Sequence, residues 1–543
     1  MTLHLRDLAQ MPAETAAVGH KLLPPTNPYR VMGDHLADVL DDAHFADLYA
    51  PTGRAAISPS LLALVTLFQF MENLPDRAAA EQVVVRLDWK YALHLPLEDT
   101  GFDFSCLCYF RRRLLEHAQE RLVFEEVLGK IQALGFIKKR GKQRTDSLAV
   151  LGAVRQLSAL ETVTETLRLA VRALAQAAPD WVARELPASF VQAYAHSRSD
   201  YRLSAPERVA ALQQVGQEGV WLLERLEATA PAALQELEAV QVLRTVWDQR
   251  YERVEGRVRV RATTVDCTEL IVTPHDPGVR AAEKRGTKWR GDKVHVTETA
   301  EADAPNFLTD VTTAPAPSVD SAALPRIRQR LAERARPPGE QYVDAGYVSG
   351  PQLAQSQEAG IDLVGPALPD TTPNQFKIAD FAIDRAAHKA LCPQGHPSVK
   401  WGVSIEPDGS QSVHIQFATA VCAACPLRPQ CTTGKSGRSL RLSEHYELVA
   451  ARRVEAQTEA FRERMRARPA IEATLSELVR KHGLRRHRYR GEAKRHFENL
   501  LKGAACNLKR LVRALAARWE RAGTWAAPAL GGPRGVGAPL LAA

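Results

Sequence analysis

Apolar residues recur at helical spacing through most of the first 135 residues. The stretch "SPSLLALVTLFQFMENL" (58–74) begins with a Ser-Pro pair, a typical helix start, and its apolar residues then repeat every three or four positions. The stretches "AAAEQVVVRLDWKYALHL" (78–95) and "CLCYFRRRLLEHAQERLVFEEVLGKIQALGF" (106–136) show the same periodicity. The pattern predicts a helical N-terminal domain that ends at a basic connector, "IKKRGKQR" (137–144).

The pattern then changes from strand to helix and back to strand. The run "TDSLAVL" (145–151) is typical of a short strand, and residues 156–250 return to amphipathic helical spacing. Further along, "RVRVRATTV" (257–265), "DKVHVTETA" (292–300) and "NFLTDVTTA" (306–314) partly alternate and are rich in Val and Thr, which favours strands.

Helices and strands alternate in the next segment. A helix is predicted over "SAALPRIRQRLAERA" (321–335), a strand over "EQYVDAG" (340–346), a helix over "GPQLAQSQEAG" (350–360) and a strand over "IDLVGPA" (361–367). This element order predicts an α/β fold in which helices flank a mixed sheet.

The C-terminal third contains a cysteine-rich, β-leaning segment followed by helices. Long helices are predicted over 445–465, 470–483 and 497–522. The tail, 523–543, is rich in Gly, Pro and Ala, so we expect it to be disordered.

Composition narrows the class of protein. The chain has 543 residues, enough for two to four domains, and a formal net charge of +8, which hints at a polyanionic partner. The longest apolar run, 60–71, is too short to span a bilayer, and the N-terminus lacks the apolar core of a signal peptide. We therefore expect a cytoplasmic protein without a membrane partner.

Three acids occupy places where a metal site is expected. Asp146 lies in a short strand, Asp344 ends a strand, and Glu472 lies on a helix. A mixed sheet flanked by helices can bring three such carboxylates to one edge, where they repel one another unless divalent cations bind them. The alternative is that each acid is an ordinary turn or cap residue, and the pattern alone leaves both interpretations open.

Several blocks, in this order, resemble DDE transposases of bacterial insertion sequences over nearly the whole chain. The stretches "PYRVMGDHLADVLDDAHFADLY", "SPSLLALVTLFQFMENL" and "FDFSCLCYFRRRL" resemble the helical N-terminal domain of these enzymes. The blocks "TDSLAVLGAVRQL", "KRGTKWRGDKVHVTET", "YVDAGY" and "AIEATLSELVRKHGLRRHRYRGEAK" resemble the first-aspartate, second-strand, second-aspartate and glutamate blocks.

The resemblance implies an RNase H-like core and a catalytic triad of Asp146, Asp344 and Glu472, which would bind two Mg²⁺ (or Mn²⁺) ions. Related glutamate blocks often carry Tyr, Arg, Glu and Lys at fixed spacing. Arg468 and Glu472 match it, whereas Met465 and Val479 stand at the Tyr and Lys places. Close relatives usually have Gly-Tyr-Lys in the second strand, and this chain has Gly-Asp-Lys ending at Lys293.

The first acid has an alternative. Asp266, in "TTVDCTEL", ends a better strand pattern than Asp146 and directly precedes the other strands of the core. Topology alone favours Asp266. The resemblance favours Asp146, with 156–250 as a helical insertion between the first two strands.

Basic residues concentrate after the glutamate block. Residues 480–496 contain eight Lys or Arg and three His against one Glu, and such a run destabilises a solvated helix face unless an anion binds it. We predict DNA phosphate contacts for this run, with Arg468 and Lys293 as further contacts. The residues are Arg480, Lys481, Arg485, Arg486, Arg488 and Arg490.

Four of the eight cysteines lie within 40 residues, at Cys392, Cys422, Cys425 and Cys431. The Cys-x-x-Cys spacing suits a structural Zn²⁺, although His396 makes a fifth candidate ligand and the outer spacings are looser than in a typical ribbon. Buried free thiols are the alternative.

The resemblance as a whole implies a DNA transposase that acts on terminal inverted repeats and target DNA as a homo-oligomer in the bacterial cytoplasm, associated with the nucleoid. The alternatives are an RNase H-like nuclease without strand transfer and an inactive DNA-binding regulator. The expected domains are a helical DNA-binding domain (1–136), a catalytic core (137–155, 251–384 and 440–500), a helical insertion (156–250), a Cys-rich insertion (385–439), a C-terminal helix (501–522) and the tail (523–543).

Overall fold

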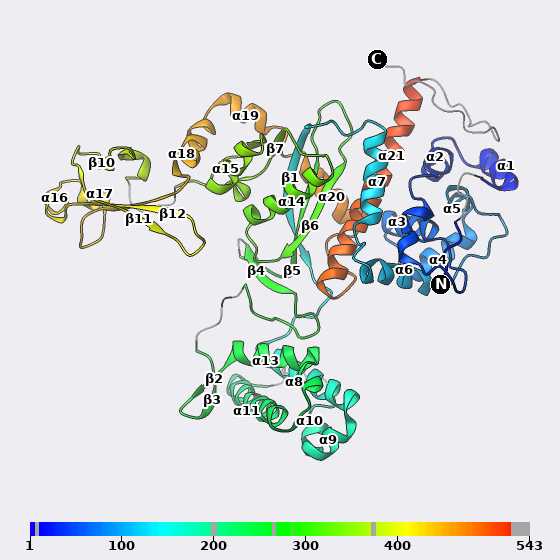
Figure 1. The fold of residues 1–543 in the computed structure, drawn as a ribbon, viewed down its shortest axis with the longest axis horizontal. Coiled ribbons are helices and arrows are strands. Elements are labelled where there is room, and N and C mark those ends of the chain that lie inside the picture. Colours follow the sequence, from blue (N-terminus) through cyan, green and yellow to red (C-terminus); the bar gives the residue numbers. More distant parts are fainter. Residues whose placement is uncertain are drawn as a thin grey trace.

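The computed structural model describes residues 1–5, 10–196, 203–262, 266, 268–284, 286–370 and 376–522. Figure 1 shows a central sheet with its helices, a helical part on its right, a helical part below it and a small β-rich part on its left. The tail predicted to be disordered and the end of the strand predicted at 257–265 lie outside the described residues.

The central sheet has the strand order β6-β5-β1-β7-β8 in the described part of the chain, and β4 pairs with the start of β5. The strands are β1 (Lys142–Leu151), β4 (Arg280–Lys284), β5 (Thr287–Thr299), β6 (Leu308–Pro315), β7 (Glu340–Tyr342) and β8 (Asp362–Val364). β5 is antiparallel to both β1 and β6, whereas β7 is parallel to both β1 and β8. This is an RNase H-like arrangement, so the predicted fold class is confirmed.

The two faces of the sheet differ because successive side chains of a strand point to opposite faces. Val294 and Val296 of β5 belong to the main hydrophobic core, while His295 and Thr297 between and beside them lie on the other face. On that face the hydroxyls of Thr297 and Thr145 are 2.9 Å apart. Asp146 is paired with Val296, so its side chain lies on the face of the two valines, at the edge of the hydrophobic core.

The N-terminal helices share their core with the sheet through one long C-terminal helix, α21 (Glu492–Ala522). Figure 1 shows α21 between the sheet and the N-terminal helices, and it contacts α3, α7 and β6. The other elements here are α1 (Ala13–Leu22), α2 (Pro28–His35), η1 (Asp42–Leu48), α3 (Pro59–Met71), α4 (Asp76–Val85), α5 (Leu87–Ala92), α6 (Ser105–Glu116) and α7 (Leu122–Ala133). Every residue of α3 is buried, and the Ser58 hydroxyl caps its first turn.

Two smaller parts have hydrophobic cores of their own. The lower part consists of α8 (Ala159–Ala177), α9 (Pro179–Glu185), α10 (Ala188–Ala193), α11 (Ala205–Thr229), α12 (Ala232–Gln235), α13 (Glu238–Arg250), β2 (Tyr251–Val254) and β3 (Arg257–Val260). The left part consists of η4 (Ile378–Asp380), β9 (Ala382–Asp384), β10 (Lys389–Leu391), β11 (Ser398–Ile405), β12 (Gln411–Phe417), α16 (Thr419–Ala424), α17 (Arg428–Cys431) and β13 (Ser439–Ser443).

The remaining elements surround the polar end of the sheet. They are η2 (Asp320–Ala323), α14 (Leu324–Glu333), η3 (Ala345–Tyr347), α15 (Gly350–Glu358), α18 (Tyr446–Glu455), α19 (Glu459–Met465) and α20 (Ile471–Lys481). The single helix predicted over 445–465 is divided in two, because the Thr458 hydroxyl accepts the Phe461 backbone N–H and starts a new helix. No described helix is long and apolar enough to cross a membrane.

Candidate active site

Asp146 and Asp344 come to the same level of the sheet through strand register. β1 and β7 are parallel, with Arg144 opposite Tyr342. Asp146 lies two residues beyond Arg144, and Asp344 lies two residues beyond Tyr342. Because side chains two residues apart point to the same face of a strand, the two carboxylates emerge beside each other where β7 ends.

Glu472 joins them from the first turn of α20, and Arg468 lies among all three acids. The Arg468 guanidinium is 2.6 Å from the Asp146 carboxylate, 4.0 Å from that of Asp344 and 3.4 Å from that of Glu472. Side-chain exposure rises from 9% at Asp146 to 36% at Asp344 and 63% at Glu472. The group therefore runs from the interior of the sheet to solvent.

The surroundings of Asp146 disfavour its ionised form. Burial raises the pKa of the Asp146 carboxyl to about 6, and the charges of Asp344 and Glu472 act in the same direction. Arg468 and the backbone N–H of Ser147 counteract this rise in pKa. A carboxylate held ionised near like charges in a buried place is typical of a site built to bind cations.

A fourth acid, Asp320, adjoins this group and was not singled out from the sequence. Its carboxylate accepts a hydrogen bond from the Ser147 hydroxyl at 3.0 Å and pairs with the Lys293 ammonium at 3.2 Å. An added Cβ at Gly346 would lie 3.0 Å from the Asp320 carboxylate and 3.1 Å from that of Asp344. Gly346 thus lets the two acids approach, although nothing in the local sequence around Asp320 indicates this proximity.

A buried pair, His295 and Tyr347, lies near the acids. Burial lowers the pKa of His295 to about 4, so the imidazole is neutral at neutral pH. The Tyr347 hydroxyl lies 2.7 Å from Nδ1 of His295, and burial together with the charges of Asp320 and Asp146 raises the pKa of Tyr347. The phenol therefore stays protonated, and its hydrogen bond with the imidazole fixes the turn that follows Asp344.

A buried ionic network fixes α20 to the sheet. Glu298 of β5 accepts from the Arg144 guanidinium at 2.7 Å and from the Thr474 hydroxyl at 2.6 Å. Arg144 also donates to the Ala467 carbonyl at 2.9 Å, just before Arg468. Thr474 lies two residues after Glu472 on the same helix, so this network sets where Glu472 stands.

The alternative first acid, Asp266, is not brought into the group. Asp266 is exposed, lies outside the described strands and accepts the backbone N–H of Thr268 at 2.9 Å. The strand pattern that favoured it ends early, since β3 stops at Val260. Among the described residues, it is Asp146 that lies beside Asp344 and Glu472.

The basic residues predicted to contact DNA fall into two groups. Arg480, Lys481, Arg485 and Arg486 are exposed, and no ion pair or side-chain hydrogen bond of theirs is found within the described part of the chain. The other basic residues have partners inside the protein. Lys293 pairs with Asp320, Arg468 with the acids, Arg488 with the Leu74 carbonyl, and Arg490 with the Ala153 carbonyl.

Part of the basic run is internal. Arg495 is 1% exposed and pairs with Asp276 at 2.5 Å and with Asp292 at 2.6 Å. His487 is fully buried, 3.0 Å from Asp292 and 3.5 Å from Glu498, and these acids raise its pKa against the effect of burial. High charge density in 480–496 therefore reflects internal ion pairs as well as an exposed basic surface.

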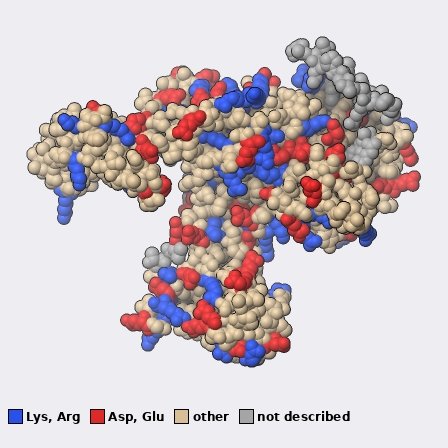
Figure 2. Space-filling view, in the orientation of Figure 1, with Lys and Arg blue, Asp and Glu red and all other residues tan. Residues whose placement is uncertain are grey.

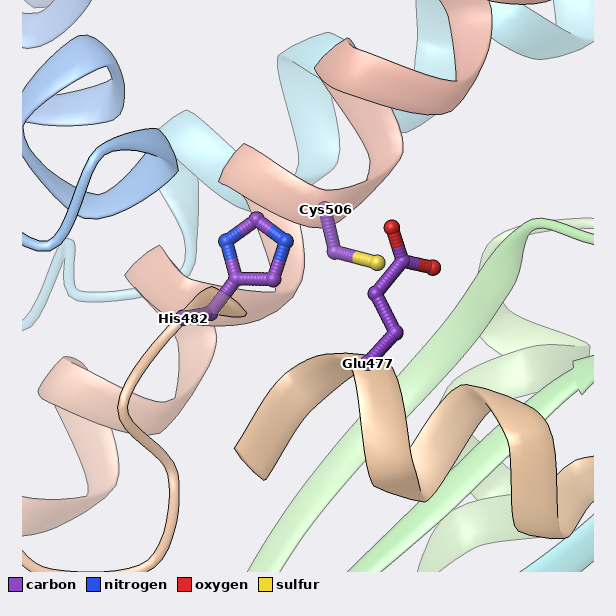
Figure 3. A group of neighbouring side chains, drawn as sticks. All are labelled: Glu477, His482 and Cys506. Atoms are coloured by element: carbon purple, nitrogen blue, oxygen red, sulfur yellow. The ribbon is translucent and has the colours of Figure 1, made fainter. Parts of the chain in front are cut away.

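One compact group of potential metal ligands lies away from these acids, in Glu477, His482 and Cys506. Figure 3 shows the Cys506 sulfur facing the Glu477 carboxylate, with His482 on the other side. Burial raises the pKa of the Cys506 thiol to about 12, and Glu477 already pairs with Arg510 at 2.9 Å and with Arg513 at 3.7 Å. A protonated thiol and a neutralised carboxylate are poor ligands, so this group packs α20 against α21.

Two family models match the chain. Residues 18–113 match a transposase domain (DUF772), and residues 391–512 match a transposase DDE domain. The second match contains Glu472 and Arg468 and begins after Asp146 and Asp344. No match was found among the curated proteins or the solved structures.

Three acids thus meet at one end of an RNase H-like sheet. The two family matches, one at each end of the chain, support a DDE transposase of an insertion sequence.

Proposed function

We propose that this transposase cuts DNA at the inverted-repeat ends of an insertion sequence and joins the freed 3′-OH ends to target DNA. The observation that supports this most directly is the meeting of Asp146, Asp344 and Glu472 around Arg468. In cutting, a water oxygen attacks the phosphorus and the 3′ oxygen leaves as the 3′-OH. In joining, that 3′-OH attacks a target phosphorus and displaces a target 3′ oxygen, so one site can serve both in-line displacements.

The three carboxylates fit the divalent ions, generally Mg²⁺, that the family implies. Their oxygens are ligands that Mg²⁺ prefers, and their number leaves positions for water and phosphate. Two such ions (Mg²⁺ or Mn²⁺), bound by Asp146, Asp344 and Glu472, would activate the attacking oxygen and stabilise the leaving one. Neutralising the acids would also relieve their mutual repulsion, which adds to the effect of burial on the pKa of Asp146.

Arg468 has two uses in this proposal. Without divalent ions its guanidinium is the cation that holds the three acids together, at 2.6 to 4.0 Å. Ions bound by the acids would release the guanidinium, which suits phosphate because it presents several N–H donors in a fixed plane. Arg468 would then hold the DNA backbone next to the reacting phosphorus.

The exposed part of the basic run is the proposed DNA surface outside the site. The backbone of 485–487 extends the sheet beyond β1, with the Leu151 N–H donating to the Arg485 carbonyl at 3.0 Å and the His487 N–H to the Leu151 carbonyl at 2.8 Å. This pairing holds the backbone of Arg485 and Arg486 at the end of the strand that carries Asp146. Figure 2 shows basic residues gathered over the middle of this face of the molecule, with acidic ones among them.

This DNA surface predicts a salt dependence. Replacing Arg485 and Arg486 by Ala should weaken DNA binding and reduce the slope of log K against log salt by about two, one for each lost phosphate contact. A matched double variant, Arg225→Ala with Arg253→Ala, removes two arginines already paired with glutamates and should leave the slope unchanged. Equal slopes for both variants would contradict the proposed surface.

The decisive experiment tests strand transfer. The purified chain is incubated in Mg²⁺ with labelled DNA carrying the sequences that flank its gene, together with a target plasmid. We expect a free 3′-OH at an inverted repeat and labelled ends joined to the plasmid. Cleavage without joining would favour the nuclease alternative, and end binding without cleavage would favour the inactive regulator.

The role of the acids is tested in the same assay. Asp344→Asn should bind the DNA ends as the parent does and lose both cleavage and joining. Asp266→Asn, at the alternative first acid, should retain both reactions. We further propose that the enzyme acts as a homo-oligomer that pairs two ends in the bacterial cytoplasm at the nucleoid, and joining of both ends of one element to one target would support that proposal.

A further inference from the structure

The β-rich part that contains residues 376–446 is small for a unit with its own core. Its fully buried apolar residues are Phe381, Ala390, Val413, Ile415, Phe417, Leu440 and Leu442. Figure 1 shows this part projecting from the central sheet, to which α18 connects it. A core of this size supplies little stability, and units of this kind usually need a metal or a disulfide.

Four cysteines from three segments of this part line one small cavity. Cys392 follows β10, Cys422 and Cys425 lie on and directly after α16, and Cys431 ends α17. They line a cavity of about 30 Å³, enough for an ion and too small for an organic ligand. All four are free thiols and half-buried.

The backbone forms a tight turn at the first of these cysteines. After Cys392 the chain turns back on itself, with the Gly395 N–H donating to the Cys392 carbonyl at 2.7 Å and the Cys392 N–H to the His396 carbonyl at 2.9 Å. Gly395 adopts a φ of +78°, which a residue with a side chain rarely tolerates. The turn aims the Cys392 side chain at the other cysteines.

A second set of contacts favours the thiolate form. The Arg438 backbone N–H donates to the Cys422 sulfur at 3.4 Å, a bond that strengthens when the sulfur is negatively charged. The Arg438 side chain is buried against the Phe381 ring and donates to the Cys431 backbone carbonyl at 3.1 Å. A buried cation next to four thiols compensates part of the charge that a tetrathiolate would carry.

His396 is the fifth candidate ligand from the sequence, and the structure favours the four cysteines over it. His396 also lines the cavity, but it is exposed, whereas the four cysteines are half-buried, and its backbone carbonyl closes the Cys392 turn. Four sulfurs with no oxygen ligand suit Zn²⁺ or another thiophilic ion and are a poor site for Mg²⁺. We propose that Cys392, Cys422, Cys425 and Cys431 bind one structural Zn²⁺ that ties the 392–396 turn to α16 and α17.

Binding would require a small closure of the site. A tetrahedral shell with Zn–S bonds of about 2.3 Å places sulfurs about 3.8 Å apart. Among the described residues, only Glu477, His482 and Cys506 place three potential ligand atoms within 4.8 Å of one another. No three of the four sulfurs therefore lie that close together. The ion would therefore draw α16, α17 and the turn together, and so order the base of β11–β13.

Metal content tests the proposal directly. The full chain, expressed with zinc and purified under reducing conditions, should contain one zinc per molecule by elemental analysis. Cobalt in its place should give the intense absorption of tetrahedral thiolate coordination. Cys422→Ser with Cys425→Ser should lose the zinc, whereas the matched pair Cys106→Ser with Cys108→Ser in α6 should retain it. His396→Ala should leave the cobalt spectrum unchanged.

A second measurement uses the unaltered chain, so it does not depend on how a variant folds. Alkylation of each cysteine is followed by peptide mass spectrometry with zinc present and after chelation, with the exposed Cys108 as internal reference. We expect Cys392, Cys422, Cys425 and Cys431 to become reactive together after chelation, while Cys108 reacts equally in both conditions. Absence of zinc, or equal reactivity of the four with and without it, would overturn the proposal and leave the proposed strand transfer untouched.

Discussion

Replacing Asp146 by Asn should stabilise the chain at neutral pH when no divalent ion is present. The pKa of this carboxyl rises from an ordinary 3.8 to about 6 because it is buried and faces Asp344 and Glu472. A rise of about two pH units corresponds to roughly 3 kcal/mol at 1.36 kcal/mol per unit. This is the most that a neutral side chain of the same shape can recover, since Arg468 keeps two acids as partners.

The advantage of the variant should depend on pH with a definite sign. The folded carboxyl binds its proton more tightly than the unfolded one, so the parent loses stability as pH rises from about 4 through about 6. Below pH 4 the carboxyl is protonated in both states and the two proteins should be equally stable. Above pH 7 the difference should be complete and independent of pH.

Calorimetry in the presence of a chelator measures this difference. For a core of this size, about 3 kcal/mol raises the melting temperature by roughly 6–12 °C, which is an upper limit. Asp47→Asn, at an exposed acid in η1, is the matched control and should change stability by less than about 0.5 kcal/mol. A variant that is less stable than the parent at pH 7.5, or a difference that persists at pH 4, would refute the electrostatic reasoning.

Three further substitutions test the contacts of Arg468, Gly219 and Gly129. Arg468→Gln should raise the affinity for Mn²⁺ in the DNA-free chain at least about tenfold, measured by electron paramagnetic resonance, because the guanidinium competes with the ions for the acids. Arg466→Gln, an exposed neighbour, is its control, and equal affinities would contradict that competition. Gly219→Ala should destabilise the helical insertion by about 1–3 kcal/mol or more, because the new Cβ would lie 2.0 Å from the Trp247 ring, and a melting temperature equal to the parent's would be inconsistent with this packing. Gly129→Ala in α7 meets nothing within 4 Å and should stabilise by about 0.5–1 kcal/mol in the same melting experiment, so a loss would contradict an open helix face there.

Helices and strands that depend on the pattern of neighbouring residues could be predicted from the sequence. Strand alternation located β1, β5 and β6. Asp344 was predicted to end a strand, and it lies two residues beyond the end of β7. The meeting of Asp146 with Asp344 follows from the parallel register of β1 and β7, which strand order alone does not specify. It required the resemblance to known transposases to prefer Asp146 over Asp266.

The parts that escaped prediction depend on contacts between distant residues. Arg495 lies in a run that suggested DNA binding, yet its partners Asp276 and Asp292 come more than 200 residues earlier. Asp320 likewise meets Ser147 across 173 residues. A run of charges indicates where countercharges are needed, and only the fold decides whether phosphate or the protein provides them.

The position of α21 has a consequence for how the protein is made. The helix α3 is buried along its whole length, partly against Leu500, Leu501 and other residues of α21, more than 400 residues later in the chain. At a synthesis rate of 5–20 residues per second, the ribosome would complete α21 roughly 20 to 90 seconds after α3. During that interval the N-terminal helices must remain partly unpacked. A chain that stops before α21 would lack both a finished core and a fixed position for Glu472. Translation to the last helix is therefore itself a condition for activity.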